Sequence, residues 1–410
     1  MLVLAIDGAD WNVMRPLLER GELPNLSALI EQGASGPLRS LEPLRRSPVI
    51  WTAIATGKSP EENGVGGAPP EGGVTQDASA YTSNMWASSA FWDVAGRSGL
   101  RVAVVGWLVT WPAWEVNGAM VSDHIHHLDA YARAAQAATL TYPPELCAQV
   151  APLVRTTESV TVEELSRFVD MGSELGLASL EGNNGTVLRT AISGDETVAA
   201  IALSLFDAEP PDVSCVYVRG VDEASHVFWI HTDPATRPPA DQSKPGTLLL
   251  EKQARALGKA LPEYYRYADE IVGRLLSRFP PTATIVVCSD HGFRGPGPWG
   301  SGRPFMGEEQ HALDGVIIMK GPGIAPGTTL CGATVYDVAP TVLALAGLPV
   351  GRDLEGRVLV EAFSREFARR HRVRYVDSND TGARERRSAP VASPADEEIQ
   401  ERMRSLGYIR

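Results

Sequence analysis

The sequence IVVCSDHGF, residues 285–293, joins an apolar run typical of a buried strand to Asp290 and His291. Burying polar groups at the end of a strand is unfavourable, because even a neutral one without partners costs about 2–7 kcal/mol. A carboxylate and an imidazole at this position therefore need a partner that offsets the cost. The stretch predicts a buried strand whose end carries a functional site.

Similar apolar runs recur along the chain and define the fold class. We expect buried strands at residues 2–6, 101–106, 213–218, 284–288 and 315–319. Helix-like stretches alternate with them, at residues 25–33, 47–56, 88–98, 194–207 and 248–279. This alternation indicates an α/β fold, with a mostly parallel central sheet and helices on both faces.

The same alternation of expected strands and helices divides the chain into regions. Residues 1–125 and 195–375 are expected to form one catalytic core. Residues 126–194 break the alternation and are expected to be an inserted cap or lid region beside the site. Residues 376–410 are expected to be a poorly ordered linker and C-terminal tail with a short terminal helix.

Composition excludes some classes of protein. The 410-residue chain has a net charge of −13, which argues against a nucleic-acid scaffold but allows a small phosphorylated substrate. No apolar run reaches the roughly 18 residues of a membrane span. The four cysteines are widely spaced and are expected to be buried free thiols. We therefore expect a cytoplasmic protein without a membrane span, and the sequence leaves its oligomeric state open.

Aspartates follow three of the expected strands, and histidines accompany them. These residues are Asp7, Asp222, His226, Asp290, His291 and His311. Ligands bind outside the carboxyl ends of strands in an open α/β sheet, so these side chains are expected to converge. Asp222 and His226 are about one helical turn apart and would face one ion if that segment is helical. Carboxylates with imidazoles are typical ligands of zinc and similar metals, although any one of these residues alone could be a helix cap or a buried polar group.

The segment RRSPVIWTAIATGKSP, residues 45–60, predicts a helix with an anion site at its start. Ser47 suits the N-cap and Pro48 suits the first helical position. The start of a helix directs N–H groups and the positive end of the dipole toward an anion, and Arg45 and Arg46 add positive charge. Ser47 either serves this anion site or only caps the helix.

Six stretches, in a particular order, carry a resemblance to a known family. They are LAIDGAD, SPVIWTAIATGKSPEENGV, VDEASH, SDHGF, QHALDGVIIMKGPGI and YDVAPTVLALAGLPVGRDLEGRVL, which together span most of residues 1–360. In them the chain resembles the alkaline phosphatase superfamily, and within it the type I phosphodiesterase/nucleotide pyrophosphatase branch. The resemblance implies an alkaline-phosphatase-like core.

The resemblance also implies two divalent metal ions, with zinc expected and manganese as the alternative. One ion would be bound by Asp222, His226 and His311, and the other by Asp7, Asp290, His291 and the oxygen of Ser47. The family places its nucleophile ten residues before the glycine of a TG pair, which is Gly57 here, so Ser47 would be the nucleophile. Arg46 and Asn63 are the expected substrate contacts, and relatives often have His-Gly where this chain has Asn63-Gly64.

This site predicts the hydrolysis of phosphate esters. Metal coordination lowers the pKa of a bound hydroxyl, and two ions can stabilise the attacking and the leaving oxygens. Attack by Ser47 would give a phosphoseryl intermediate that water hydrolyses. We therefore expect a binuclear metal-dependent hydrolase of phosphodiester or nucleotide pyrophosphate bonds. The alternatives are a phosphomonoesterase or phosphomutase of the same superfamily and a non-enzymatic phosphate-binding protein.

Three further expectations concern the substrate. Diesters should react at least as well as monoesters, because beyond the metals only Arg45 and Arg46 add positive charge near the nucleophile. The aromatic segments MWASSAFW (85–92) and GWLVTWPAW (106–114) are expected either to line the substrate cavity or to belong to the core. A polar loop is expected near the cleft entrance, with Asp123, His124, His126 and His127. The alternatives are that these residues bind a metal, support the ligands of one or contact the substrate.

Three other activities are disfavoured by their motifs. TGKS (56–59) lacks the Walker A glycine, because Thr52 occupies its position. GPGPWG (295–300) has prolines where a dinucleotide-binding helix should begin. A sulfatase nucleophile begins the motif C/S-x-P-x-R, whereas Ser47 is followed directly by Pro48 and position 51 is Trp.

Overall fold

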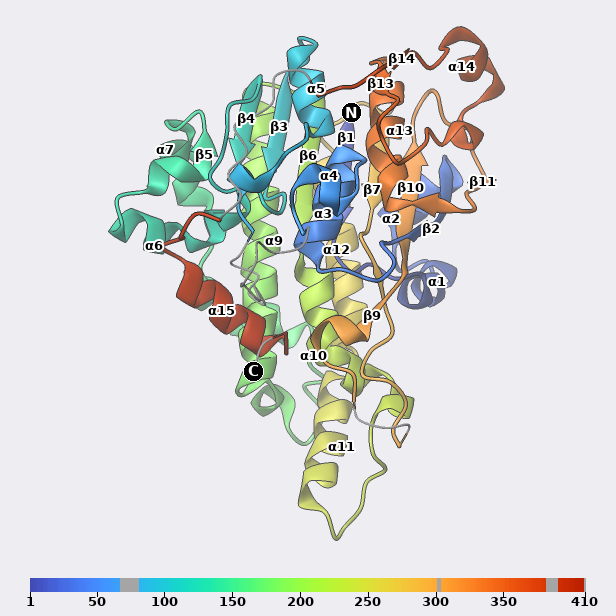
Figure 1. Cartoon of the computed structure of the whole chain (residues 1–410). Coiled ribbons are helices and arrows are strands. Elements are labelled where there is room, and N and C mark those ends of the chain that lie inside the picture. Colours follow the sequence, from blue (N-terminus) through green and yellow to red (C-terminus); the bar gives the residue numbers. More distant parts are fainter. Residues whose placement is uncertain (67–80, 301–303, 381–389, 409–410) are drawn as a thin grey trace.

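The computed structural model describes residues 1–66, 81–300, 304–380 and 390–408 (Figure 1). Within these residues, ten strands form one sheet in the order β11-β2-β10-β7-β1-β6-β3-β4-β5, with β12 beside β2. Their bounds are β1 (Leu2–Ile6), β2 (Ala34–Arg39), β3 (Val102–Val105), β4 (Gly118–Val121), β5 (Thr141–Tyr142), β6 (Val213–Val218), β7 (Ile285–Cys288), β10 (Asp314–Lys320), β11 (Thr328–Thr329) and β12 (Ala333–Thr334).

The sheet confirms the predicted fold class. Strands β7, β1, β6, β3 and β4 are neighbours that pair in parallel. β10 lies antiparallel between β7 and β2, and β5 is antiparallel at the edge. β1, β3, β6, β7 and β10 match the expected strands to within one residue at each end. The sequence did not predict β2 and β4. β2 contains Gly and Pro and β4 contains Gly, and both residue types are uncommon in strands.

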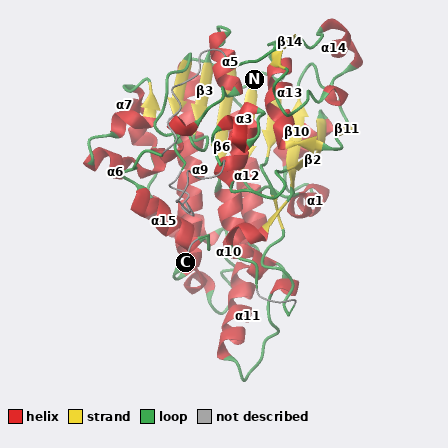
Figure 2. Cartoon of the chain, viewed as in Figure 1, coloured by secondary structure: helices red, strands yellow, loops and turns green. Residues whose placement is uncertain are grey.

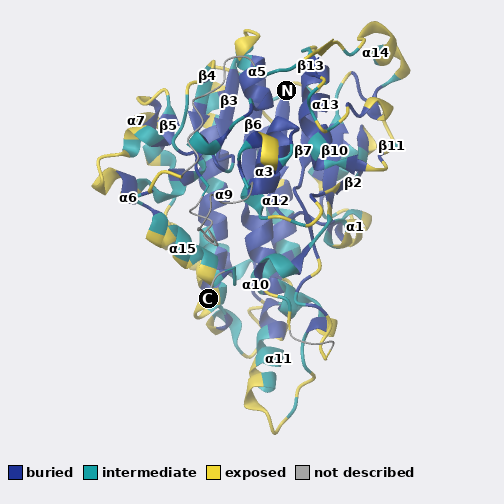
Figure 3. Ribbon diagram, in the orientation of Figure 1, coloured by how far each residue is buried: buried dark blue, intermediate teal, exposed yellow. Residues whose placement is uncertain are grey.

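Helices cover both faces of the sheet (Figure 2). Successive side chains of β1 enter two different apolar clusters, because neighbouring residues of a strand point to opposite faces. Leu2, Leu4 and Ile6 pack with α1 (Trp11–Glu19), α2 (Pro24–Glu31), α9 (Asn183–Ala208), α10 (Gly220–Thr232) and α12 (Ala260–Leu276). Val3 and Ala5 pack with α3 (Ser47–Thr56), α5 (Phe91–Arg97) and α13 (Val338–Leu345). Figure 3 shows the central strands buried between these helices.

Two expected helices differ in extent from the observed ones. The expected helix 194–207 is the second half of α9, which begins at Asn183. The expected helix 248–279 is two helices, α11 (Pro245–Leu257) and α12, which are separated at Gly258 and Lys259. Glycine is a weak helix former, which explains the position of the break.

Residues 126–194 pack onto the core. They contain short helices and the edge strand β5, which pairs with β4. Their apolar side chains, including Leu140, Leu165 and Phe168, belong to the same cluster as Leu2. α9 runs across the expected boundary at residue 194. The role of this region as a cap stays a prediction.

Four of the five tryptophans in the two aromatic segments belong to the core. Trp86, Trp92, Trp107 and Trp111 are at most 1% exposed. Trp107 lies edge-on to Trp51, with ring centroids 5.2 Å apart. The alternative in which these four rings line the substrate cavity is therefore wrong.

The expected short terminal helix is α15 (Asp396–Ser405). Residues 381–389 of the expected linker and residues 409–410 lie outside the described residues. Cys147, Cys215 and Cys288 are buried as expected, whereas Cys331 is exposed because it lies in the connection between β11 and β12. In the described parts of the chain, no helix is both long enough and apolar enough to cross a membrane.

Candidate metal and nucleophile site

Three neighbouring strands bring their aspartates to one edge of the sheet. β1 lies between β6 and β7, so Asp7 after β1 meets Asp290 after β7 and Asp222 in the first turn of α10. The Asp7 backbone N–H donates to Val218 O at 3.0 Å. Gly8 has a φ of +66°, and a Cβ there would lie 2.9 Å from the Asp222 Cβ. Only glycine allows so close an approach of the two segments.

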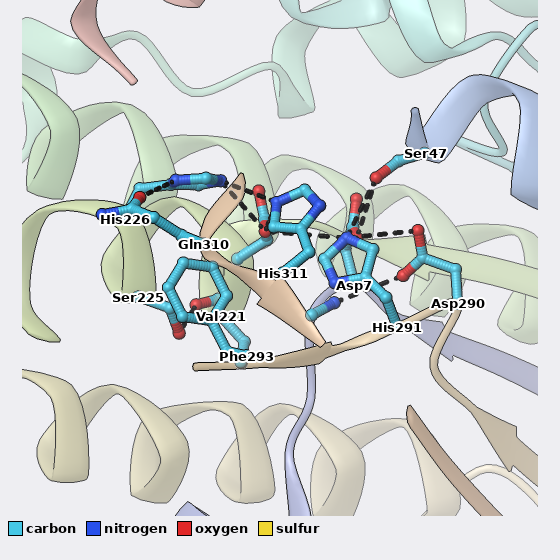
Figure 4. Close-up of polar contacts among 12 residues, drawn as sticks. Asp7, Ser47, Val221, Ser225, His226, Asp290, His291, Phe293, Gln310 and His311 are labelled. Carbon is cyan, nitrogen blue, oxygen red and sulfur yellow. Dashed lines mark hydrogen bonds and ion pairs between the residues drawn. The ribbon is translucent and has the colours of Figure 1, made fainter. Parts of the chain in front are cut away.

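One group of candidate metal ligands combines Asp222, His226 and His311 (Figure 4). Asp222 Oδ1 lies 3.4 Å from His226 Nε2 and 3.5 Å from His311 Nε2. The two histidine Nε2 atoms are 3.0 Å apart. His226 Nδ1 donates to Gln310 Oε1 at 2.7 Å, which leaves the lone pair of Nε2 facing the group. The segment is helical, so Asp222 and His226 lie one turn apart as expected.

A second group combines Asp7, Asp222 and His291. His291 Nε2 lies 3.5 Å from Asp7 Oδ1, 3.9 Å from Asp222 Oδ1 and 3.5 Å from Asp290 Oδ2. The other ring nitrogen, Nδ1, donates to Gly292 O at 3.0 Å, so Nε2 presents its lone pair to the carboxylates. All six predicted side-chain ligands therefore lie together. Asp222 is within reach of both groups, where the resemblance implied Asp290 for the second.

The donor set fits divalent cations. Burial and the charge of Asp222 raise the pKa of Asp7, and burial and the charge of Asp7 raise the pKa of Asp290. Asp222 Oδ1 and Asp290 Oδ2 are buried, and neither has a hydrogen-bond partner among the described residues. Burial lowers the pKa of His311 to about 3, so this imidazole is neutral and available as a ligand. Carboxylates crowded in this way are unfavourable unless cations bind them.

Ser47 faces the second ligand group. Its hydroxyl donates to Asp7 Oδ1 at 3.4 Å, and Oγ lies 3.2 Å from His291 Nε2. Ser47 is the first residue of α3, and the N-cap is Arg46, one residue earlier than expected. The Ser47 hydroxyl is directed at Asp7 and His291 rather than back at its own helix, so Ser47 does not cap α3 (Figure 4).

A cavity lies beside Ser47, and several elements line it. Its lining includes Asp7, Arg46, Tyr81, Leu108, Val109, Arg219, Asp222, Arg402 and Tyr408. The polar cluster expected near the cleft also lines it, with Asp123, His124, His126 and His127. Arg46 is at the cavity as expected, and its Nε binds Glu308 Oε1 at 2.5 Å.

Two arginines that line this cavity were not predicted from the sequence. Arg219 directly precedes α10 and Arg402 belongs to α15. The premise that only Arg45 and Arg46 add positive charge near the nucleophile is therefore wrong. Arg219 directly follows β6, and ligands bind beyond the carboxyl ends of strands in such sheets, so its position in the sequence could have indicated a site residue. The charged sequence of α15, DEEIQERMRS, looks like that of any solvent-exposed helix, so it gives no signal for Arg402.

Asn63 has a structural role. Its side chain is fully buried, its Nδ2 donates to Lys58 O at 3.1 Å, and its Oδ1 accepts from Val65 N at 2.9 Å. The amide thus joins the residue two positions before α4 (Pro60–Asn63) to the turn that follows it. This placement argues against the predicted substrate contact.

Comparisons with known proteins identify the family of this chain and similar folds. Residues 1–296 match the family model described as type I phosphodiesterase / nucleotide pyrophosphatase. Choline-sulfatase of Rhizobium meliloti (strain 1021) is 34% identical over 107 residues, which are 24% of this chain and only 20% of that protein. The fold is similar to a 2-O GAG sulfatase, with a TM-score of 0.51, and to a putative sulfatase from Bacteroides thetaiotaomicron VPI-5482, with a TM-score of 0.52. Each structural match covers 88% of this chain and 73% of the other at 13% identity, and shows the fold alone.

Proposed function

Because the chain belongs to the type I phosphodiesterase / nucleotide pyrophosphatase family, hydrolases of the alkaline phosphatase superfamily, we propose that it cleaves phosphodiester or nucleotide pyrophosphate bonds with Ser47 as the nucleophile. The position of the Ser47 hydroxyl supports the proposal most directly. It lies 3.4 Å from Asp7 Oδ1 and 3.2 Å from His291 Nε2, among the candidate metal ligands and at the start of a helix. A serine hydroxyl needs such an environment to become nucleophilic at neutral pH.

Members of the superfamily are metal-dependent, and two ions, zinc or manganese, are proposed for this chain. Asp222, His226 and His311 would hold one ion, and Asp7, Asp290 and His291, with Asp222 in reach, would hold the other. When bound, such ions lower the pKa of a nearby hydroxyl and stabilise negative charge on the phosphate and the leaving oxygen.

Ser47 would carry the phosphoryl group between two displacements. In the first, its Oγ forms a bond to phosphorus while the bond to the leaving oxygen breaks. The leaving group departs as an alcohol from a phosphodiester, which takes up the serine proton, or as a phosphate from a pyrophosphate, in which case the proton passes to that phosphate or to solvent. In the second, water attacks phosphorus, the phosphoseryl bond breaks, and Ser47 Oγ recovers a proton. Negative charge on the phosphate lies at the positive end of the α3 dipole in both steps.

Sulfate esters are the second candidate substrates. The match to a choline-sulfatase over 107 residues favours them. The nucleophile segment favours phosphate instead, because Ser47 is followed by Pro48 and Trp51 stands where the sulfatase motif has arginine.

A hydrolysis panel tests the proposal. Aryl phosphomonoesters, phosphodiesters, phosphonate esters and sulfate esters would be assayed with added zinc, manganese or magnesium. The family match, rather than the number of cations at the cavity, leads us to expect that bis-p-nitrophenyl phosphate is cleaved at least as well as p-nitrophenyl phosphate, and both faster than an aryl sulfate. A monoester preference of about 100-fold, close to 3 kcal/mol of transition-state binding, would indicate a phosphomonoesterase. A sulfate ester as the best substrate would indicate a sulfatase.

A further inference from the structure

The C-terminal segment, residues 390–408, lies against the candidate site. Five of its residues line the same cavity as Ser47: Ile399, Arg402, Met403, Leu406 and Tyr408. Figure 1 shows the red helix α15 beside α9 and α10, well apart from the elements that precede it in the chain. The end of the chain is thus part of the cavity wall.

Polar contacts near both ends of α15 hold it in this position. Glu398 Oε2 accepts from His127 Nδ1 at 2.8 Å, near the start of the helix. The carbonyl oxygen of Ser405, at its end, accepts from Asn183 Nδ2 at 2.8 Å. The helix is therefore attached at both ends to the region of residues 126–194, through His127 and Asn183.

Tyr408 brings the chain end to the first ligand group. Its hydroxyl oxygen lies 2.7 Å from His226 Nε2 and 3.0 Å from His311 Nε2. These are the two nitrogens that the metal would use. The C-terminal segment therefore contacts the candidate metal ligands directly, through the Tyr408 hydroxyl.

Arg402 is held at the cavity wall by Glu223. Arg402 Nη2 lies 2.6 Å from Glu223 Oε1, and the same oxygen lies 3.1 Å from Arg219 Nε. The Glu223 side chain is only 1% exposed. Two guanidinium groups therefore share one buried carboxylate, which can satisfy only part of their hydrogen-bonding capacity.

Arg402 also has an unused donor. Its Nε is buried and has no hydrogen-bond partner in the described parts of the chain. Burial lowers the pKa of Arg402, but the charges of Glu223, Asp222 and Asp7 outweigh this and raise it, so the guanidinium stays charged. Cations bound by Asp7 and Asp222 would neutralise those carboxylates and leave the guanidinium available to an incoming anion.

We propose that Arg402 binds a non-bridging oxygen of the phosphate group that is transferred to Ser47, so that α15 forms part of the substrate site. The inference rests on the proposed phosphate-ester chemistry. A guanidinium suits this task because it donates parallel hydrogen bonds to phosphate oxygens. A monoester has three non-bridging oxygens and two negative charges, whereas a diester has two oxygens and one charge. Arg402 therefore contributes more to the hydrolysis of monoesters than of diesters, and it affects the ratio of kcat/KM between the two substrates.

The test compares Arg402→Met with Arg404→Met. Arg404 is a matched control on the same helix, because it is 47% exposed and binds only Glu401, at 2.9 Å, among the described residues. We expect Arg402→Met to lower kcat/KM for p-nitrophenyl phosphate by about 100-fold and for bis-p-nitrophenyl phosphate by about 10-fold or less. Arg404→Met should change either value by less than about 2-fold.

A second readout does not depend on turnover. Inorganic phosphate binding to zinc-loaded protein, measured by calorimetry, should weaken by about 10-fold or more in Arg402→Met at unchanged zinc content. The melting temperature should fall, because the variant loses the Arg402–Glu223 ion pair, so calorimetry is done well below it. If that variant does not fold, Arg402→Lys keeps the charge and should bind phosphate more weakly than the wild type. Equal losses on both esters, or phosphate binding unchanged in the Arg402 variants, would overturn the proposal.

The two proposals can fail separately. If the wild-type protein hydrolyses sulfate esters and no phosphate ester, the proposed function fails. Inorganic sulfate then replaces phosphate in the calorimetry. Weaker sulfate binding by Arg402→Met than by Arg404→Met would support Arg402 as the oxyanion-binding residue, and equal binding would refute it.

Discussion

Ser47→Ala removes the oxygen that attacks phosphorus in the first displacement of the proposed mechanism and keeps all six side-chain metal ligands. Removing the nucleophile of a serine hydrolase can lower kcat by about 10⁶-fold. We expect a fall of at least about 10⁴-fold here, because the candidate metal site would retain some ability to activate water.

The cost to stability should be small. The Ser47 hydroxyl donates one hydrogen bond, to Asp7 at 3.4 Å. This is longer than the usual 2.5–3.0 Å between hydroxyl and acceptor oxygens, so its loss should cost less than about 1 kcal/mol. Alanine is also a good helix former at the first turn of α3. The melting temperature should therefore change by no more than about 2 °C.

Thr52→Ala is the matched control in the same helix. Thr52 is fully buried, and its Oγ1 donates to Pro48 O at 2.8 Å inside α3. Losing a buried methyl group and this hydrogen bond should destabilise the fold by about 1–2 kcal/mol. Because Thr52 faces the core, kcat should stay within a few-fold of the wild-type value.

The assay measures kcat on aryl phosphate esters, metal content by elemental analysis and thermal unfolding for each variant. The expected pattern is an inactive, stable Ser47→Ala and an active, less stable Thr52→Ala. Wild-type turnover in Ser47→Ala at full metal content would refute the assignment of the nucleophile. Metal content is measured because loss of ions would itself explain an inactive variant.

Three further predictions concern the metals, the pH dependence and the attachment of the C-terminal region. Asp222→Asn should reduce the zinc content from about two ions per chain to nearly none, because Asp222 lies in both ligand groups. His226→Gln should remove about one ion, because His226 lies in one group. Elemental analysis of zinc-loaded, desalted protein measures the zinc content of both variants. Burial lowers the pKa of His124 to about 3, below its unfolded value near 6.5, so the unfolded state binds the proton first as pH falls. The free energy of unfolding should therefore fall between about pH 6.5 and 3, and urea titrations should show a smaller fall for His124→Phe. Lys58→Met should destabilise the fold by about 1–2 kcal/mol in the same titrations without changing kcat, because Lys58 Nζ binds Asp353 at 2.6 Å and Asp380 at 2.7 Å.

Much of the sheet and of the ligand set is readable from local sequence. A strand covered on both faces must be apolar at every position, as β1 is, so its pattern is visible without knowledge of its neighbours. The aspartate that follows such a strand can also be recognised in the sequence, because its charge interrupts the run of apolar residues. Asp7 and Asp290 are found in this way, and the helical spacing of Asp222 and His226 links a second ligand to them.

Other features depend on packing that no local pattern records. A Trp-rich segment has the same composition whether it lines a cavity or fills the core, and only the edge-on packing of Trp107 and Trp51 decides for the core. Asn63 likewise could have faced the cavity, but its amide is used by Lys58 and Val65.

The sequence by itself determined which segments become buried strands and helices and which acidic and histidine residues stand at their ends, because these depend on burial and on neighbours along the chain. Only the tertiary structure decided that β1 lies between β6 and β7, so that the three aspartates meet. It also decided that Tyr408, 182 residues away in the chain, reaches His226, and that Arg402 shares Glu223 with Arg219. Such contacts follow from the summed packing of whole elements, which the pattern of any one segment does not contain.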